Sequence, residues 1–206
     1  MDAFNSVAQG AFISNAVLGS VRELVLLMRR VLKSVIIGVF LVRIVFQDIA
    51  ARGKTSVDWF FGFKLHLLVN ERGELLNLQI TPGNIDDRKP VSELVQSLFG
   101  KIFADRGYVS QPLANKLLQE FGIQFFAKPR RNMKNRLMLL SDKLLARKRS
   151  IIETVIDQLK NISQIEHSRH RSPVNFGVNI LCGLIAYCYQ PKKPSLNLKK
   201  DLAQYT

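Results

Sequence analysis

The sequence predicts an α/β fold, in which a mixed β-sheet is flanked by helices and the C-terminal part is largely helical. Aromatic and β-branched residues lie on both sides of a short glycine-bearing turn over residues 59–81. Two short apolar segments, 100–105 and 123–128, enclose a helical pattern, and further helical patterns follow at 141–162 and 174–189. This order of strands and helices indicates helices packed on a mixed sheet.

Before the hairpin the pattern is less regular. Residues 21–32 place apolar side chains at helical spacing, which predicts an amphipathic helix. Residues 35–46 are apolar, β-branched and aromatic, which predicts a buried strand. The basic, glycine-containing residues 51–55 predict a break. We therefore divide the chain into an atypical N-terminal segment (1–46), an α/β domain (47–190) and a basic C-terminal tail (191–206).

The hairpin is predicted from two strands, 59–69 and 74–81, with a turn at residues 70–73. Its aromatic residues are expected in the core, with stacking on nucleobases as the alternative; they are Trp59, Phe60, Phe61 and Phe63. His66 is expected to be a packed core histidine or a surface histidine rather than a base.

The remaining elements have recognisable ends. Residues 89–98 are helical in pattern, and residues 100–105 form an apolar strand that ends on Asp105. Ser110 is a candidate N-cap for the helix over 110–121, with Gly122 just past its end. Ser141 is a candidate N-cap for a helix over 141–162.

The composition favours a polyanion as partner. The chain has 30 Lys and Arg against 16 acidic residues, a formal net charge of +14, so nucleic acid is the first candidate and an anionic membrane surface the second. Residues 35–46 are too short to span a membrane, and no secretion signal is predicted. Cys182 and Cys188 are expected to be reduced core residues of a cytoplasmic protein.

Two carboxylates stand out as candidates for chemistry. Asp105 ends a predicted strand, a position that can present a side chain at a sheet edge, although Asp before Gly is also common in turns. Glu153 shares one face of a predicted helix with Arg149 and Lys160. That pattern suits a metal held beside a phosphate backbone, and it equally suits a solvated ion-pair face.

These residues resemble a known family. Two motifs look like the second and third catalytic acidic residues of bacterial insertion-sequence transposases of the DDE class. The first is Phe-Ala-Asp-Arg-Gly-Tyr at 103–108. The second is Glu153, with Arg149 four residues before it and Lys160 seven after it. The hairpin ending in Thr-Pro-Gly at 81–83 also matches. The similarity covers about residues 53–198 and implies an RNase H-like fold.

The resemblance implies a chemistry and a set of roles. In the family three carboxylates hold two divalent ions, Mg²⁺ or Mn²⁺, for phosphoryl transfer at DNA ends. Asp105 and Glu153 would be metal ligands, and double-stranded DNA, as element terminal repeats and target, would be the partner of a homo-oligomer in the bacterial cytoplasm or nucleoid. By the resemblance, Lys160 would contact the DNA end and Arg149 would make a phosphate or structural contact. The positive charge of Lys128, Arg130 and Arg131 is expected to hold the DNA backbone.

The family's first carboxylate is missing at its expected place. Residues 21–46 contain one acidic residue, Glu23, and the nearest substitutes are Asp48 and Asp58. We expect impaired catalysis and an N-terminal segment translated from a shifted or unrelated frame. A non-catalytic DNA-binding remnant, a nuclease or integrase of the same fold, and a membrane-surface protein remain alternatives. Zinc at His167 and His170 lacks a clear third ligand.

Overall fold

The computed structural model describes residues 24–33, 45–55, 59–129, 138–147, 150–166 and 172–195, with backbone only for residues 24–33. Six strands form one sheet: β1 (Leu24–Lys33), β2 (Ala51–Lys54), β3 (Trp59–Asn70), β4 (Leu75–Pro82), β5 (Lys101–Ala104) and β6 (Gln124–Ala127). The helices are α3 (Val91–Leu94), α4 (Gln111–Phe121), α5 (Leu140–Arg147), α6 (Ser150–Asn161) and α7 (Pro173–Cys188), with a 3₁₀ turn, η1, at Arg106–Tyr108.

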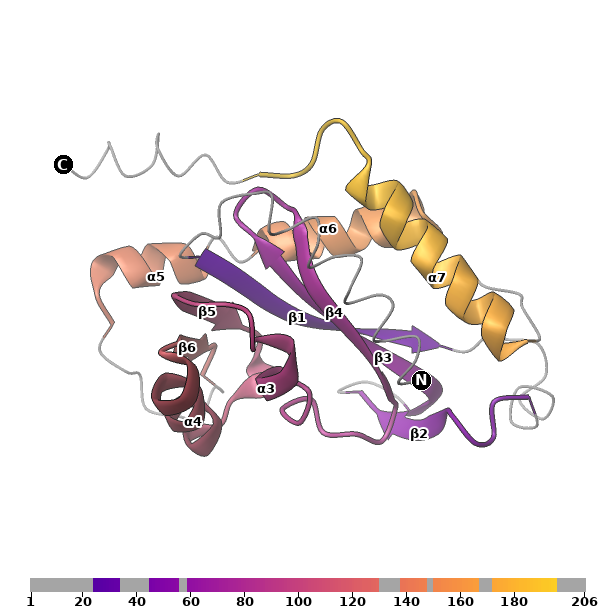
Figure 1. The fold of residues 1–206 in the computed structure, drawn as a ribbon, viewed down its shortest axis with the longest axis horizontal. Coiled ribbons are helices and arrows are strands. Elements are labelled where there is room, and N and C mark those ends of the chain that lie inside the picture. Colours follow the sequence, from indigo (N-terminus) through magenta and orange to yellow (C-terminus); the bar gives the residue numbers. More distant parts are fainter. Residues whose placement is uncertain are drawn as a thin grey trace.

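The sheet is mixed, as the sequence predicts. β3 pairs antiparallel with β1, β2 and β4, whereas β1, β5 and β6 run parallel. β1 crosses the middle of the molecule, with α6 and α7 on one side and α3 and α4 grouped around β5 and β6 (Figure 1). This is the architecture expected of an RNase H-like domain.

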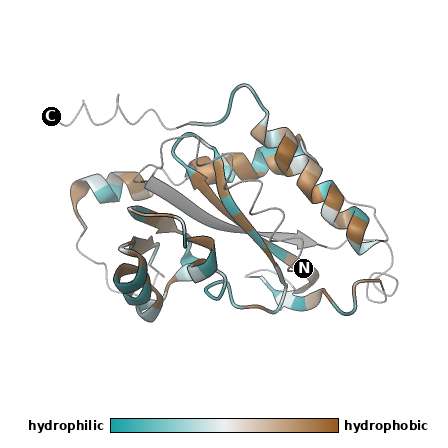
Figure 2. Ribbon diagram, in the orientation of Figure 1, coloured by the Kyte–Doolittle hydropathy of each residue, from teal (hydrophilic) through white to brown (hydrophobic). Residues whose placement is uncertain are grey.

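Two hydrophobic clusters cover the two faces of the sheet. The first joins alternate residues of β3, including Leu65 and Leu67, with Phe103 and the buried sides of α6 and α7. The second joins Leu68, Ile102 and Ala104 with α3 and α4. Successive side chains of a strand point to opposite faces, so each buried strand serves both clusters. Figure 2 shows the apolar colouring concentrated on β3, β4 and α7.

An aromatic group and one hydrogen bond dock α7. The rings of Phe46, Phe63 and Phe176 pack with centroids 5.3–6.0 Å apart. Near the other end of the helix, buried Tyr187 donates from its hydroxyl to the carbonyl of Gly73 at 2.7 Å, and burial raises the pKa of this phenol. The hairpin turn and the last helix are thereby held together.

Several predicted elements are confirmed. β3 and β4 form the predicted hairpin, and β5 ends directly before Asp105. Helix α4 begins after Ser110, whose hydroxyl accepts from the backbone N–H of Leu113 at 3.3 Å, and ends before Gly122. Five apolar residues of α6 are buried: Ile151, Ile152, Val155, Ile156 and Leu159.

Other predictions are wrong. The segment predicted as an amphipathic helix is β1, because pairing with β3 and β5 outweighs the helical spacing of its apolar residues. The predicted break at 51–55 is β2, which pairs with the first residues of β3. A strand was also predicted over residues 35–46. Its residues 35–44 lie outside the described part of the chain, and Phe46 belongs to a turn.

The predicted long helix is two helices. α5 begins at Leu140, and its first helical hydrogen bond runs from the N–H of Lys143 to the carbonyl of Leu139. Ser141 therefore lies inside the helix and is not its N-cap. α5 is anchored by the ion pair between buried Asp142 and Lys101 of β5, at 2.7 Å.

Candidate functional site

Asp105 stands at the carboxyl end of the parallel strands. The preceding residues of β5 are buried, and Asp105 itself is partly exposed with an extended backbone. The N–H of Tyr108 donates to the carbonyl of Asp105 at 3.1 Å and closes the η1 turn. The carboxylate is thus placed where a buried strand meets the surface, a common location for functional side chains.

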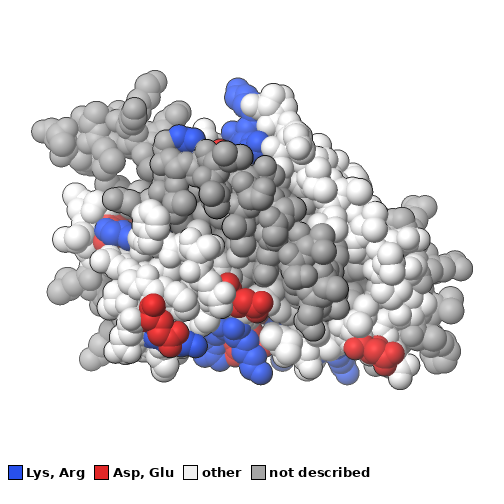
Figure 3. Space-filling view, viewed as in Figure 1, with Lys and Arg blue, Asp and Glu red and all other residues white. Residues whose placement is uncertain are grey.

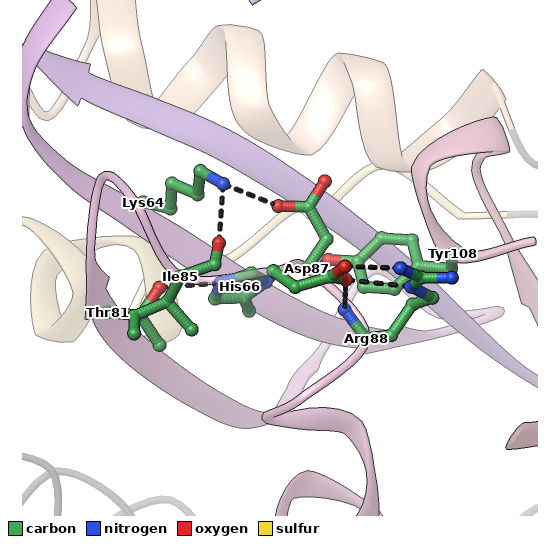
Figure 4. Close-up of polar contacts among 8 residues, drawn as sticks. Lys64, His66, Thr81, Ile85, Asp87, Arg88 and Tyr108 are labelled. Atoms are coloured by element: carbon green, nitrogen blue, oxygen red, sulfur yellow. Dashed lines mark hydrogen bonds and ion pairs between the residues drawn. The ribbon is translucent and has the colours of Figure 1, made fainter. Parts of the chain in front are cut away.

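A buried polar network lies behind this turn (Figure 4). His66, in the middle of β3, is fully buried, with Nδ1 2.9 Å from the Tyr108 hydroxyl and Nε2 3.0 Å from the Thr81 hydroxyl. His66 is therefore a packed histidine, as predicted. It ties β3, β4 and the η1 turn together through groups that must be paired when buried.

A buried ion pair extends the network. Lys64 of β3 donates to Asp87 at 2.9 Å and to the carbonyl of Ile85 at 2.7 Å, and both charged side chains are less than 10% exposed. A methyl group on Gly107 would lie 2.8 Å from the second carboxylate oxygen of Asp87. A larger residue at position 107 would therefore displace the Asp87 carboxylate, which packs directly against the η1 turn.

The neighbouring Asp86 is a surface residue. Arg88 donates from Nε to Asp86 at 2.8 Å, and a second guanidinium nitrogen also contacts the carboxylate. The hydrogen bonds from Arg88 hold the pKa of Asp86 well below its usual range, while the Asp86 carboxylate raises the pKa of the Arg88 guanidinium. Asp86 and Asp87 thus differ in role, although they are adjacent in sequence.

Glu153 lies in the first turn of α6 and is exposed. Helix α6 packs on the sheet face that contains Phe103, and the two-residue repeat of a strand puts Asp105 in phase with Phe103. Strand periodicity and helix packing therefore assign both carboxylates to the same side of the sheet.

The expected DNA contacts are only partly described. Lys128 directly follows β6 and is exposed, and its N–H donates to the carbonyl of Ala104, next to Asp105. Lys160, in the last turn of α6, lies 3.7 Å from the carboxylate of Glu166. Arg130, Arg131 and Arg149 lie outside the described residues. The backbone of Lys128 thus lies at the end of β5, next to the residue that precedes Asp105.

Of the two candidate replacements for the first carboxylate, Asp48 and Asp58, the structure describes one. Asp48 is exposed in the turn that follows Phe46, and Asp58 lies outside the described residues, as do His167 and His170. Within the described ranges, no group of three or more His, Cys, Asp or Glu side chains gathers to hold a metal ion. Asp105 and Glu153 offer the oxygen donors that divalent cations prefer, but the described donors fall short of a complete two-metal site.

Two further expectations concern exposure. Cys182 is exposed, which corrects its expected place in the core, and Cys188 is half-buried. Phe60 and Phe63 are core residues, whereas Trp59 is 52% exposed. No helix in the described parts of the chain is long and apolar enough to cross a membrane.

Sequence reasoning missed the buried network. The sequence signal for this network is the pair Lys64 and His66, two polar residues two positions apart in an otherwise largely apolar strand. Such spacing indicates one face of a strand, and buried polar groups there require partners. The partners Asp87 and Tyr108 are distant in sequence, so only the fold identifies them.

The sequence of this chain is similar to that of a known family. A family model described as "Transposase DDE domain" matches residues 39–173, more than half of the chain. No curated protein and no solved structure matches this chain. The matched segment contains Asp105, Glu153, Lys128 and Lys160, and it begins after β1.

Proposed function

Because this chain belongs to the transposase DDE domain family, we propose that its fold is that of an enzyme which cleaves and transfers insertion-sequence ends by metal-dependent phosphoryl transfer. In this proposal Asp105 and Glu153 are two of the metal ligands, and Mg²⁺ or Mn²⁺ supplies Lewis-acid stabilisation of the attacking and leaving oxygens when bound. The partner is double-stranded DNA, and a homo-oligomer in the bacterial cytoplasm, nucleoid-associated on DNA, would act on it.

The position of Asp105 carries the proposal. It is a partly exposed carboxylate at the end of a buried parallel strand, with a buried polar network behind its turn and the backbone of Lys128 next to the strand end. A carboxylate held this way can bind a cation while neighbouring positive charge attracts a phosphate backbone. Glu153 adds a second carboxylate from the helix on the same side.

We further propose that this copy is catalytically impaired. β1 is the strand beside β5, and Leu27 is level with Ala104, so Met28 is next in register to Asp105. β1 contains no Asp or Glu. Two carboxylates without a third should bind a pair of divalent cations weakly, because hard cations need several oxygen ligands.

The second candidate is a non-catalytic DNA-binding remnant. The absence of an acidic residue from the sequence of β1 favours it, together with the formal net charge of +14. The start of the family match at residue 39 supports the companion proposal that the N-terminal segment derives from a shifted or unrelated frame. Sequencing the surrounding DNA tests this, since an upstream frame that encodes family sequence continuous with the chain would remove it.

The test is cleavage of labelled DNA carrying the element's own terminal repeats, with Mg²⁺ or Mn²⁺. The chain is compared with Asp105→Ala and Glu153→Ala, and binding of the same DNA is measured in parallel. Nicking abolished by both substitutions would establish the enzyme and contradict impairment. Binding without nicking would establish the remnant, and absence of binding would overturn both.

A further inference from the structure

The sole tryptophan of the chain, Trp59, lies at the surface where β2 meets the start of β3. Its neighbour Phe60 is buried at 6% exposure, whereas Trp59 is 52% exposed. A methyl group on Gly53 would lie 2.5 Å from the Phe60 ring, so glycine in β2 makes the room for Phe60 to turn inward. Because side chains alternate along a strand, seating Phe60 inside directs Trp59 outward.

Two cations lie over the exposed indole. The guanidinium carbon of Arg52 lies 4.4 Å from the ring centroid, and the ammonium of Lys54 lies 5.4 Å from it. Both side chains are exposed, and Lys54 is the cross-strand partner of Trp59. Within the described part of the chain neither cation pairs with a carboxylate, so their charge remains available to an anion.

An exposed indole covered by cations has the chemistry of a nucleotide site. A nucleobase can stack against the indole or against the planar guanidinium that lies over it, while the cations attract the adjoining phosphates; this combination underlies binding of unpaired strands without sequence readout. A core role does not account for the exposure of Trp59. An interaction with a neutral protein surface does not account for the two cations.

The site is separate from Asp105. Leu27 of β1 pairs with Leu68 of β3 on one side and with Ala104 of β5, the residue before Asp105, on the other. Trp59 precedes Leu68 by nine residues on β3. At about 3.3 Å per residue, the separation along the strands is about 30 Å. Bound DNA that reaches both points would extend about nine base pairs at about 3.4 Å each.

We propose that Trp59, Arg52 and Lys54 form a binding site for an unpaired nucleotide of the DNA substrate, remote from Asp105. The proposal rests on the DNA-binding function proposed above. The site would bind a DNA strand that carries an unpaired base, and membership of the family does not by itself specify this form of DNA.

Intrinsic fluorescence tests the proposal on the unaltered full-length chain, because all tryptophan emission comes from residue 59. The probes are a single-stranded oligonucleotide and the matching duplex, with binding followed separately by the anisotropy of a label on the DNA. We expect the single strand to quench Trp59 strongly and the duplex to do so weakly. Equal quenching by both, or by inorganic polyphosphate, would overturn base stacking.

Variants give a second readout. Trp59→Ala should weaken single-strand binding at least about fivefold, whereas Tyr189→Ala, which removes an aromatic side chain 82% exposed on another part of the chain, should not. Arg52→Gln should weaken binding more than Lys89→Gln, which removes the same charge elsewhere on the surface. Thermal melting checks that each variant is folded.

The two proposals fail in different ways. If neither DNA changes the anisotropy, DNA binding itself is absent and the proposed function fails. If DNA binds but Trp59 emission is unchanged and Trp59→Ala binds equally well, only the nucleotide site is overturned.

Discussion

The imidazole of His66 lies 2.9 Å from the hydroxyl of Tyr108, and this contact joins the middle of β3 to the turn that presents Asp105. Both residues are almost completely buried. The orientation of a surface carboxylate is therefore tied to groups that solvent does not reach.

Tyr108→Phe should destabilise the protein by about 1–3 kcal/mol, because it removes the hydroxyl partner of a buried imidazole nitrogen. The free energy of unfolding in urea measures the effect. Tyr189→Phe, at an exposed tyrosine, is the matched control and should change little. A Tyr108→Phe variant as stable as the unaltered chain would show that the contact contributes nothing to stability.

Asp87→Asn should cost about 3 kcal/mol or more, because it leaves the ammonium of Lys64 buried beside a neutral group. Adding Lys64→Met should restore much of the loss, since the stranded charge is then gone. If the double variant is no more stable than Asp87→Asn, the buried charge is not the cause. Urea unfolding of the three variants supplies the comparison.

Asp86→Asn should cost at most about 1 kcal/mol at neutral pH, since this side chain is 40% exposed. The hydrogen bonds from Arg88 lower the pKa of folded Asp86, so its contribution is present above the ordinary value of 3.8 and is lost as the pH falls through the folded pKa. Unfolding measured from pH 7 down to acid should show the variant and the unaltered chain converging. Divergence on acidification would contradict the assigned direction.

Met28→Asp should raise the affinity for Mn²⁺, because position 28 is next in register to Asp105 and would add a third carboxylate to the proposed site. Calorimetric titration with Mn²⁺ measures the change, for which we expect at least about tenfold, the effect of roughly 1.4 kcal/mol of added binding free energy. Met28→Asn is the neutral control, and Asp105→Ala should cancel the gain. Equal affinities for the Asp and Asn variants would refute the assignment of this position.

Alkylation by iodoacetamide should distinguish the two thiols. Cys182 is exposed, whereas burial raises the pKa of the half-buried Cys188 to about 11, so little of its reactive thiolate exists at neutral pH. Peptide mass spectrometry should find Cys182 modified first at pH 7, and the rate at Cys188 should rise about tenfold per pH unit between pH 7 and 9. Equal rates in the folded protein would contradict the burial of Cys188, while equal rates are expected in urea.

Local chemistry accounts for what the sequence predicted well. The hairpin has a polar turn between aromatic and β-branched strands, and α4 has a serine at its start and a glycine after its end. These features act within a few residues, so they are visible without the fold. The position of Asp105 directly after an apolar strand was predicted for the same reason.

Long-range pairing accounts for what the sequence predicted poorly. β1 has helical spacing of apolar residues but pairs with β3 along nearly its whole length, and β2 is short, basic and glycine-containing. The partners of Lys64 and His66 are 23 and 42 residues away. Such contacts depend on the topology, which no local pattern encodes.

The surface of α7 differs from the rest of this basic chain. The helix contains no Asp, Glu, Lys or Arg, and its outer side exposes Val174, Val178 and Ile185. Figure 3 shows this part of the molecule without charged side chains. High ionic strength, which would weaken attachment to DNA, would leave any self-association through this helix intact.

β1 occupies the centre of the sheet although the family match begins after it. A central strand is required to supply backbone hydrogen bonds on both sides, whereas catalysis in the family would also require one acidic side chain from it. These two demands are separable, so a strand can satisfy the first without the second. The stability of the sheet is therefore no measure of the chemistry that the proposed site can perform.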